Sequence, residues 1–296
     1  MLAVTLFCGY INIHCNIIPS NIRQPNSFEI LGIVQDGGRP HLNCTKECCL
    51  NVKTPNRVAS IAVHGNADWV LVDATPDMVA QIQDVGSMPK AILLTHAHMG
   101  HYIGLAQLGR EAMSANNMNV WCSESMASYL KNNGPWSQLV ELNNIKLNIF
   151  SPNEPFEIIK GVKAIAYSVP HRKEFSDTHA FELEVNNQKA LYVPDIDSWE
   201  EWPEFLNIAE QQNFLLIDAT FYDNNELGNR DMSQIPHPRV TESMDLLEPI
   251  VKSSDIQVYF IHINHTNPIL DKSSNAYKEV KMRGFNVSKK NDVLRK

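Results

Sequence analysis

The stretch that decides the fold is AILLTHAHMGHYIGL, residues 91–105. Its first four residues form an apolar run with the length and composition of a buried strand. Three histidines follow, His96, His98 and His101, before Gly104 opens an apolar-periodic segment that predicts a helix to about residue 116. The histidines are therefore expected in a loop at the carboxyl end of a strand, where open α/β sheets bind ligands.

These histidines have the chemistry and spacing of metal ligands. Imidazole is the commonest metal ligand in proteins, and zinc binds its nitrogens at about 2.0–2.1 Å. In extended backbone His96 and His98 point to the same side, because side chains alternate with a period of two. His101 follows after a turn and can face the same ion or a second one. The alternative, three unrelated surface histidines, is hard to reconcile with a position between a buried strand and a helix.

The segment THAHMGH, residues 95–101, resembles the H-x-H-x-D-H motif of the metallo-β-lactamase superfamily. That resemblance implies an α/β fold, a four-layer αβ/βα sandwich in which two mixed β-sheets are flanked by helices. It also implies that the aspartate of the motif ligates a second metal ion. Gly100 stands where that aspartate belongs, so the number of ions is left open between one and two.

Composition sets limits on the function. The chain has 296 residues, is 44% hydrophobic and carries a net charge of −8 without a basic run. We therefore expect a small-molecule substrate and no nucleic-acid partner. No apolar run reaches the ~18 residues of a membrane span, so stable membrane insertion is not expected.

The first 27 residues differ from the rest, and we expect the globular domain to span residues 28–296. Residues 1–13 are apolar and residues 16–26 are polar with two prolines, the order found in a signal peptide. However, no Lys or Arg precedes the apolar part and no A-x-A cleavage site follows it. Residues 1–27 are thus interpreted as a leader or a disordered segment, which leaves periplasmic, exported and cytoplasmic locations open.

A second group of ligand-type residues lies at His41, Cys44, Cys48 and Cys49. Thiolates suit zinc, and a closed tetrahedral site needs four ligands, so these residues are candidates for a structural zinc site. If the protein is exported, a disulfide competes with zinc. Simple burial of one cysteine is the other alternative.

A long polar loop at residues 229–238 follows a buried strand that ends at Asp218. Loops of this length often act as lids over a functional site. His237 belongs to this loop, and it is expected either to line the pocket or to lie on the surface.

Further candidates follow from the resemblance, because later strands also end in histidine or aspartate. The resemblance implies that His171 joins His96 and His98 around the first ion. It implies a bridging carboxylate at Asp195, with Asp197 as the alternative, and a final ligand at His265, with His262 as the alternative. Because residues 262 and 265 fall on opposite faces of an extended chain, only one of them is expected to face the metal.

Several phrases in order, among them LGIVQDGG, VLVDATPD, LYVPDID and FIHINHTNP, resemble the coenzyme PQQ synthesis protein B group from about residue 28 to about 290. Members of that group that serve PQQ synthesis lack the first two histidines of the motif and keep its aspartate. This chain does the reverse, so the resemblance does not carry the reaction over.

The expected function is metal-dependent hydrolysis. Zinc lowers the pKa of bound water from 15.7 towards ~7, so metal-bound hydroxide is expected to attack an ester, thioester, lactone, amide or phosphodiester. Asp195, His101 and His265 are expected to hold a second ion or to act as base and oxyanion partners, with Asp195 and His265 as the proton-transfer groups. Iron that activates oxygen in a PQQ-type biosynthetic reaction is the alternative, and manganese is a further metal candidate. A binding protein with a decayed site is the non-enzymatic alternative.

Overall fold

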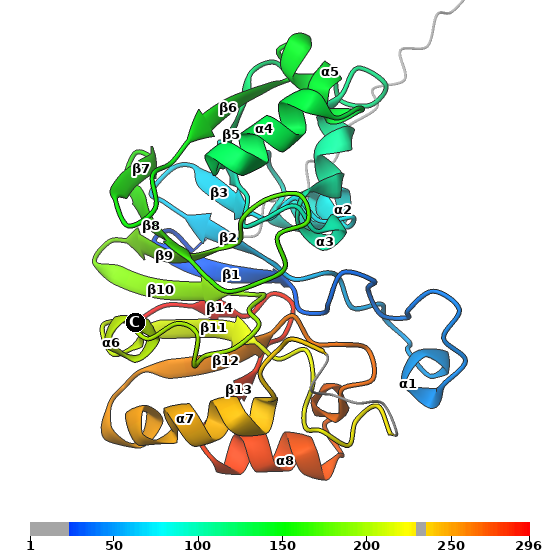
Figure 1. Ribbon diagram of the computed structural model, residues 1–296, viewed down its shortest axis with the longest axis vertical. Helices are drawn as coiled ribbons and strands as arrows, with labels where there is room; N and C mark the ends of the chain where they lie inside the picture. Colours follow the sequence, from blue (N-terminus) through cyan, green and yellow to red (C-terminus); the bar gives the residue numbers. More distant parts are fainter. Residues whose placement is uncertain (1–23, 229–234) are drawn as a thin grey trace, which may run out of the picture.

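The computed structural model describes residues 24–228 and 235–296, and within them two β-sheets stack face to face with helices on both outer faces (Figure 1). This confirms the four-layer sandwich. The predicted leader falls largely on residues 1–23, which lie outside the described residues.

Each sheet contains seven of the described strands. The first sheet, in spatial order, consists of β14 (Val293–Leu294), β1 (Ser27–Gly32), β2 (Ser60–His64), β3 (Trp69–Val72), β4 (Ala91–Leu93), β5 (Met118–Cys122) and β6 (Ile145–Ile149). The second consists of β13 (Asn286–Val287), β12 (Gln257–Ile261), β11 (Phe214–Asp218), β10 (Gln188–Val193), β9 (His179–Val185), β8 (Val162–Ser168) and β7 (Pro155–Ile159).

The helices cover the outer faces of the two sheets (Figure 1). Against the first sheet lie α2 (Met78–Val85), α4 (Glu124–Asn132) and α5 (Trp136–Glu141), and against the second α6 (Phe205–Ala209), α7 (Val240–Ser253) and α8 (Asn275–Met282). The short helices α1 (Glu47–Leu50) and α3 (Met99–Tyr102) lie in loops, and the segment with α1 extends away from the sheets.

Both faces of the strands are apolar because both are buried. In β3, Val70 and Val72 face the core between the sheets, whereas Trp69 and Leu71 face the helices. This alternation, with apolar residues on both sides, is typical of strands that have a layer on each face. Strands β2 and β3 form a hairpin, since they pair antiparallel with His64 opposite Trp69.

The predicted helix over residues 104–116 is wrong. Helix α3 begins earlier, at Met99, and continues as a 3₁₀ helix only from Ile103 to Leu108. Gly104 lies so close to the chain before α2 that a Cβ there would come within 2.9 Å of the Ala74 carbonyl oxygen. The backbone therefore makes a tight contact at this point, and Gly109 then takes an extended conformation that ends the helix.

The parallel strands determine where ligands can bind. Strands β3, β4 and β5 run parallel in the first sheet, and β10, β11 and β12 do so in the second. The loops after β4, β10 and β12 carry side chains that interact with one another, so these strand ends meet at one edge of the sandwich. That edge is the place expected for a site in sheets of this kind.

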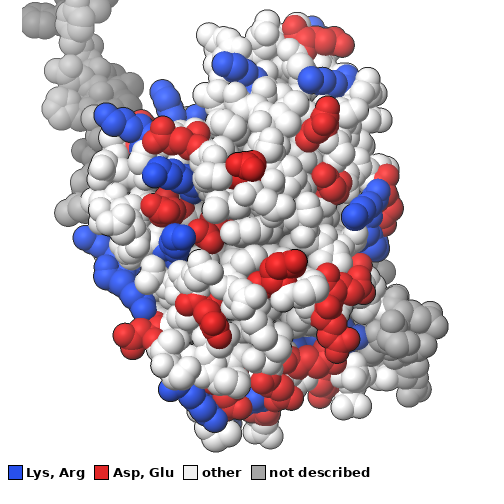
Figure 2. All heavy atoms as spheres, turned by 60° about the vertical axis from the view of Figure 1, so that its left-hand side comes forward, with Lys and Arg blue, Asp and Glu red and all other residues white. Residues whose placement is uncertain are grey.

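The surface is mixed in charge. On the face shown in Figure 2, acidic side chains gather towards the lower right and basic ones are most frequent on the left. None of the helices in the described part of the chain has the length and apolar character needed to cross a membrane.

Candidate metal centre

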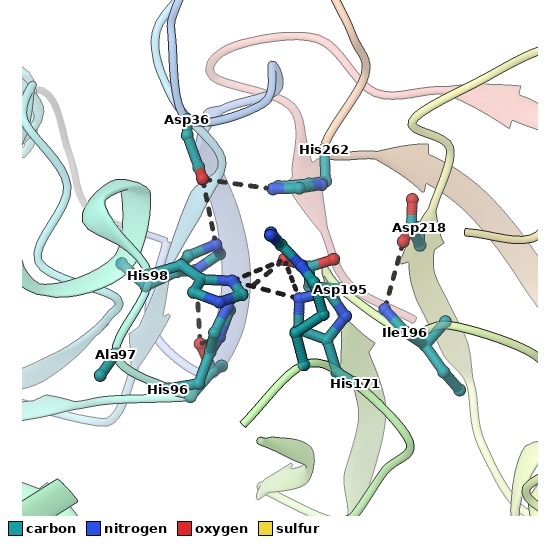
Figure 3. Close-up of polar contacts among 12 residues, drawn as sticks. Asp36, His96, Ala97, His98, His171, Asp195, Ile196, Asp218 and His262 are labelled. Atoms are coloured by element: carbon teal, nitrogen blue, oxygen red, sulfur yellow. Dashed lines mark hydrogen bonds and ion pairs between the residues drawn. The ribbon is translucent and has the colours of Figure 1, made fainter. Parts of the chain in front are cut away.

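The loops after β4, β8 and β10 bring four predicted ligands together. His96 and His98 follow β4, His171 follows β8, and Asp195 follows β10. Side chains from both sheets therefore converge on one point, as Figure 3 shows.

The ligand atoms of this first cluster have the separations expected around one cation. Asp195 Oδ2 lies 3.3 Å from His96 Nε2 and 3.1 Å from His171 Nε2, and His171 Nε2 lies 3.1 Å from His98 Nδ1. His98 Nδ1 is 3.8 Å from Asp195 Oδ2. Tetrahedral zinc with bonds of 2.0–2.1 Å places its ligand atoms about 3.3 Å apart, so this donor set fits zinc.

The other ring nitrogens of these histidines have partners that orient the rings. His171 Nδ1 donates to Asp197 Oδ1 at 2.6 Å, and His98 Nε2 lies 3.2 Å from Glu174 Oε2. His96 Nδ1 lies 3.0 Å from the Thr95 hydroxyl. Such outer partners commonly hold metal-binding imidazoles in place. Asp197, the alternative to Asp195, thus contacts His171 from the outside.

Burial and charge act together on this cluster. Burial and the neighbouring His101 hold the pKa of His96 well below its ordinary value. Burial acts to raise the pKa of Asp195, but His171 and the other imidazoles outweigh it and hold the pKa well below the ordinary value. Burial acts to lower the pKa of His171, but Asp195 and Asp197 raise it to about 9. Neutral His96 and ionised Asp195 are in the protonation states that metal ligands require.

A second cluster lies beside the first and consists of Asp36, His101 and His262. Asp36 Oδ1 is 3.4 Å from His101 Nε2 and 3.5 Å from His262 Nε2. Asp73 Oδ2 accepts from His101 Nδ1 at 2.7 Å, and the Thr220 hydroxyl lies 3.2 Å from His262 Nδ1. Both rings therefore point Nε2 towards Asp36, as Figure 3 shows for His262.

The charges of the second cluster are also coupled. Burial acts to raise the pKa of Asp36, but His101 and His262 hold it well below its ordinary value. Burial acts to lower the pKa of His101, but Asp73 and Asp36 outweigh it and raise the pKa well above the ordinary value.

The two clusters share a further property. Several of their buried polar atoms have no hydrogen-bond partner among the described residues: His96 Nε2, His101 Nε2, His262 Nε2, Asp36 Oδ1 and Asp195 Oδ1. Buried polar atoms are nearly always paired, and a bound ion is one explanation for exceptions. These histidine and aspartate clusters therefore support a metal cofactor.

The structure places His262, not His265, in the histidine clusters. His262 has a left-handed backbone conformation, with φ of 58°, which turns its ring into the site directly after β12. His265, the preferred of the two candidates, lies outside the histidine clusters. Asn264 Oδ1 accepts from the His265 backbone N–H at 3.0 Å and lies 2.9 Å from its Nδ1.

His265 instead joins the cysteines. Its ligand atom and those of Cys44, Cys48 and Cys49 all lie within 4.8 Å of one another. The Sγ atoms of Cys44 and Cys48 are 4.0 Å apart, and all three cysteines are free thiols. His41 was predicted to be the fourth member, but it stacks on the His265 ring at 4.3 Å between centroids and is not a member of the group.

His237 and Asp218 complete the inner edge of the site. His237 Nδ1 lies 2.8 Å from Asp218 Oδ2 and 3.3 Å from Asp195 Oδ1. Burial acts to lower the pKa of His237, but the two aspartates raise it. His237, which was assigned either to the pocket or to the surface, is buried and lines a cavity of about 530 Å³ together with Asp197. Residues 229–234 of the predicted polar lid lie outside the described part of the chain.

Sequence reasoning missed Asp36 and the pairing of Asp218 with His237. Asp218 was recognised only as the last residue of a strand. Asp36, which follows the segment of β1, was not among the predicted ligands. The absent carboxylate at position 100 was the signal that could have prompted a search for another one.

Comparisons with known proteins agree with this fold. Residues 68–263 match the family described as Beta-lactamase superfamily domain. The Coenzyme PQQ synthesis protein B of Acinetobacter baumannii is 27% identical over 298 residues, which cover 88% of this chain and 96% of that protein.

Two solved structures share the architecture. Zn²⁺-bound PqqB from Methylobacterium extorquens has a TM-score of 0.78 at 22% identity and covers 91% of this chain and 100% of its own. A diphosphatase from the PhnP family has a TM-score of 0.68 at 20% identity, with coverage of 90% and 96%. At these identities the two structures support the fold alone.

Proposed function

Since the chain belongs to the β-lactamase superfamily, we propose that it is a metal-dependent hydrolase that uses zinc to cleave an ester, thioester, lactone or phosphodiester. The observation that carries the proposal is the buried cluster of His96, His98, His171 and Asp195, whose ligand atoms face one another at separations that suit a cation.

Each residue of the site has a role that follows from its contacts. His96 Nε2, His98 Nδ1 and His171 Nε2 hold the cation, and Asp195 Oδ2 completes the donor set. The bound cation supplies Lewis acidity, which polarises the substrate oxygen and acidifies water at neutral pH. Asp195 Oδ1 is the atom placed to accept a proton, because it is buried and has no hydrogen-bond partner in the described structure. His265 has no part in this proposal, because it lies with the cysteines.

The charge of the cavity beside His237 limits which classes of substrate can bind there. Carboxylates of Asp197, Glu200 and Glu242 line it together with aromatic residues such as Trp199. Its described lining residues include no Lys or Arg. A polyanionic group is disfavoured next to three carboxylates, so a neutral ester, thioester or lactone fits this cavity better than a phosphodiester.

Metal content and hydrolysis test the proposal together. The full chain is purified without added metal, analysed for elements and assayed on a panel of aryl esters, thioesters, lactones and phosphodiesters. We expect His98→Ala to lose one metal equivalent and the hydrolytic activity. His64→Gln is the matched control, because His64 contacts Glu29 away from the clusters and should keep both. Unchanged metal content and activity in His98→Ala would refute the proposal.

The donor set leaves a second reaction to be tested. Imidazole and carboxylate suit iron as well as zinc, and the first cluster contains only these ligand types. Iron in the purified protein together with oxygen uptake would replace hydrolysis by an oxygenase reaction. Zinc without oxygen uptake supports hydrolysis.

The cysteine cluster is proposed to hold a structural zinc ion. Cys44, Cys48, Cys49 and His265 provide four ligand atoms, the number that closes a tetrahedral site and leaves no open position for substrate. We expect Cys48→Ser to lose one zinc and to make the loop around α1 more sensitive to protease, with hydrolysis largely retained. Full retention of zinc in this variant would contradict the assignment.

A further inference from the structure

The carboxylate of Asp36 lies at Gly100, the position at which the H-x-H-x-D-H motif has its aspartate. A Cβ atom built on Gly100 would lie 2.7 Å from Asp36 Cγ, closer still to its Oδ1, and 2.9 Å from its Cα. Real Cβ atoms essentially never come so close to other atoms. The carboxylate of Asp36 therefore occupies the space in which a side chain at position 100 would begin, and the two cannot be present together in this backbone.

The contacts of Asp36 are those of a ligand rather than of an ion pair. Its Oδ1 lies 3.4 Å from His101 Nε2 and 3.5 Å from His262 Nε2. Charge-assisted N–H···O bonds are shorter, about 2.7–2.9 Å, whereas two ligands of one tetrahedral zinc ion are about 3.3 Å apart. All three atoms are buried and lack a hydrogen-bond partner among the described residues.

The backbone fixes Asp36 beside His262. The N–H of Gln35 donates to the carbonyl of Ile263 at 3.0 Å, and the N–H of Ile263 donates to the carbonyl of Ile33 at 2.9 Å. These bonds join the residues next to Asp36 and His262 directly. The loop after β1 is therefore held against the loop after β12, and Asp36 keeps its position without a side-chain bond.

We propose that Asp36, His101 and His262 form a second cation site, in which Asp36 supplies the carboxylate that Gly100 lacks. The chain then binds two ions side by side at the histidine clusters. This inference rests on the proposed function for the presence of the first ion, but its ligands are different residues and can be removed separately.

The test measures metal stoichiometry, which does not depend on a known substrate. The full chain and its variants are stripped with chelator and titrated with zinc by calorimetry, and bound zinc is counted by elemental analysis after desalting. We expect Asp36→Ala to bind one zinc fewer than the unmodified chain, and Asp36→Ala with His98→Ala to bind two fewer. Asp245→Ala is the control, because its exposed carboxylate contacts Arg283, outside the histidine clusters, and its loss should leave the zinc stoichiometry unchanged.

An exchange of positions tests whether the carboxylate itself is what matters. Asp36→Gly combined with Gly100→Asp moves the carboxylate to position 100. We expect this double variant to bind the zinc ion that Asp36→Ala loses. The new Cβ still approaches the Cα of residue 36 at 2.9 Å, so its recovered affinity should be lower than that of the unmodified chain. Thermal unfolding of the metal-free variants shows whether each one is folded.

The outcomes separate the inference from the proposed function. Unchanged zinc stoichiometry and affinity in folded Asp36→Ala would overturn the inference and leave Asp36 as an ion-pair partner of His101. If Asp36→Ala loses one ion while His98→Ala loses none, the inference stands and the proposed hydrolase site fails.

Discussion

Asp73 offers the sharpest test of how the site is held together, through the substitution Asp73→Asn. The side chain of Asp73 is fully buried, and it accepts from the Thr95 N–H at 2.9 Å, the Thr95 hydroxyl at 2.9 Å and His101 Nδ1 at 2.7 Å. Its φ is 68°, a left-handed conformation that asparagine tolerates as well as aspartate. The substitution therefore changes the hydrogen bonds and leaves the backbone unstrained.

The size of the effect follows from these contacts. In either orientation, the new side-chain amide at position 73 would turn its N–H₂ group towards a buried N–H donor, of Thr95 or of His101. An unsatisfied buried group costs about 1–3 kcal/mol, and breaking a buried ion pair costs about 3–5 kcal/mol. We expect the free energy of unfolding of the metal-free protein to fall by about 3 kcal/mol. We also expect the second zinc equivalent to bind about 10–100-fold more weakly, as when other outer partners of metal ligands are lost.

Urea unfolding and zinc titration measure the two effects. Asp77→Asn is the matched control, since the side chain of Asp77 accepts from the backbone N–H of Val58 and Asp77 belongs to neither cluster. It should lose about 1 kcal/mol and keep the zinc affinity. If Asp73→Asn unfolds like Asp77→Asn and binds both zinc ions with unchanged affinity, the positioning role of Asp73 is refuted.

Three further predictions concern the rest of the molecule. Burial acts to raise the pKa of Asp84, but Lys290 and Arg57 outweigh it and hold the pKa below its ordinary 3.8. Asp84→Asn should therefore lower the unfolding free energy by about 1 kcal/mol above pH 4, and this difference should shrink as the pH falls through the folded-state pKa. A difference that is independent of pH would contradict this prediction. Phe181→Ala, in the core between the sheets, should lower it by about 3–5 kcal/mol in urea unfolding, and a loss below about 1 kcal/mol would show that this core is loosely packed. Removal of metal with chelator should lower the melting temperature, because zinc at 100 times its Kd stabilises the folded state by about 2.7 kcal/mol per site, whereas an unchanged melting temperature would argue against zinc at both kinds of cluster.

The architecture was predictable because the signals for it are local. The run at residues 91–94, the hairpin around Gly65 and the histidines at strand ends each follow from periodicity and turn chemistry, and the resemblance joined them into one fold. His96 and His98 of the first cluster could be anticipated from their place after a buried strand, whereas His171 and Asp195 were implied by the resemblance.

The second cluster could not be anticipated from local patterns. Asp36 occupies its position because Gly100 leaves room, a relation between two loops distant in the sequence. His262 faces the site because its backbone is left-handed, and the rule of alternating side chains does not apply at such a residue. His265 then turns away towards cysteines that precede it by more than 200 positions, which no spacing rule links to it.

The placement of the ligands has a mechanical consequence. In both proposed sites one part of the donor set comes from loops of the first sheet and the other from loops of the second. Each ion would thus link the two sheets, and its binding free energy would stabilise the packing of one sheet against the other. Deuterium uptake at the amides of β2 and β9, which face each other across that interior, should therefore slow when metal is bound, while the outer helices exchange as before.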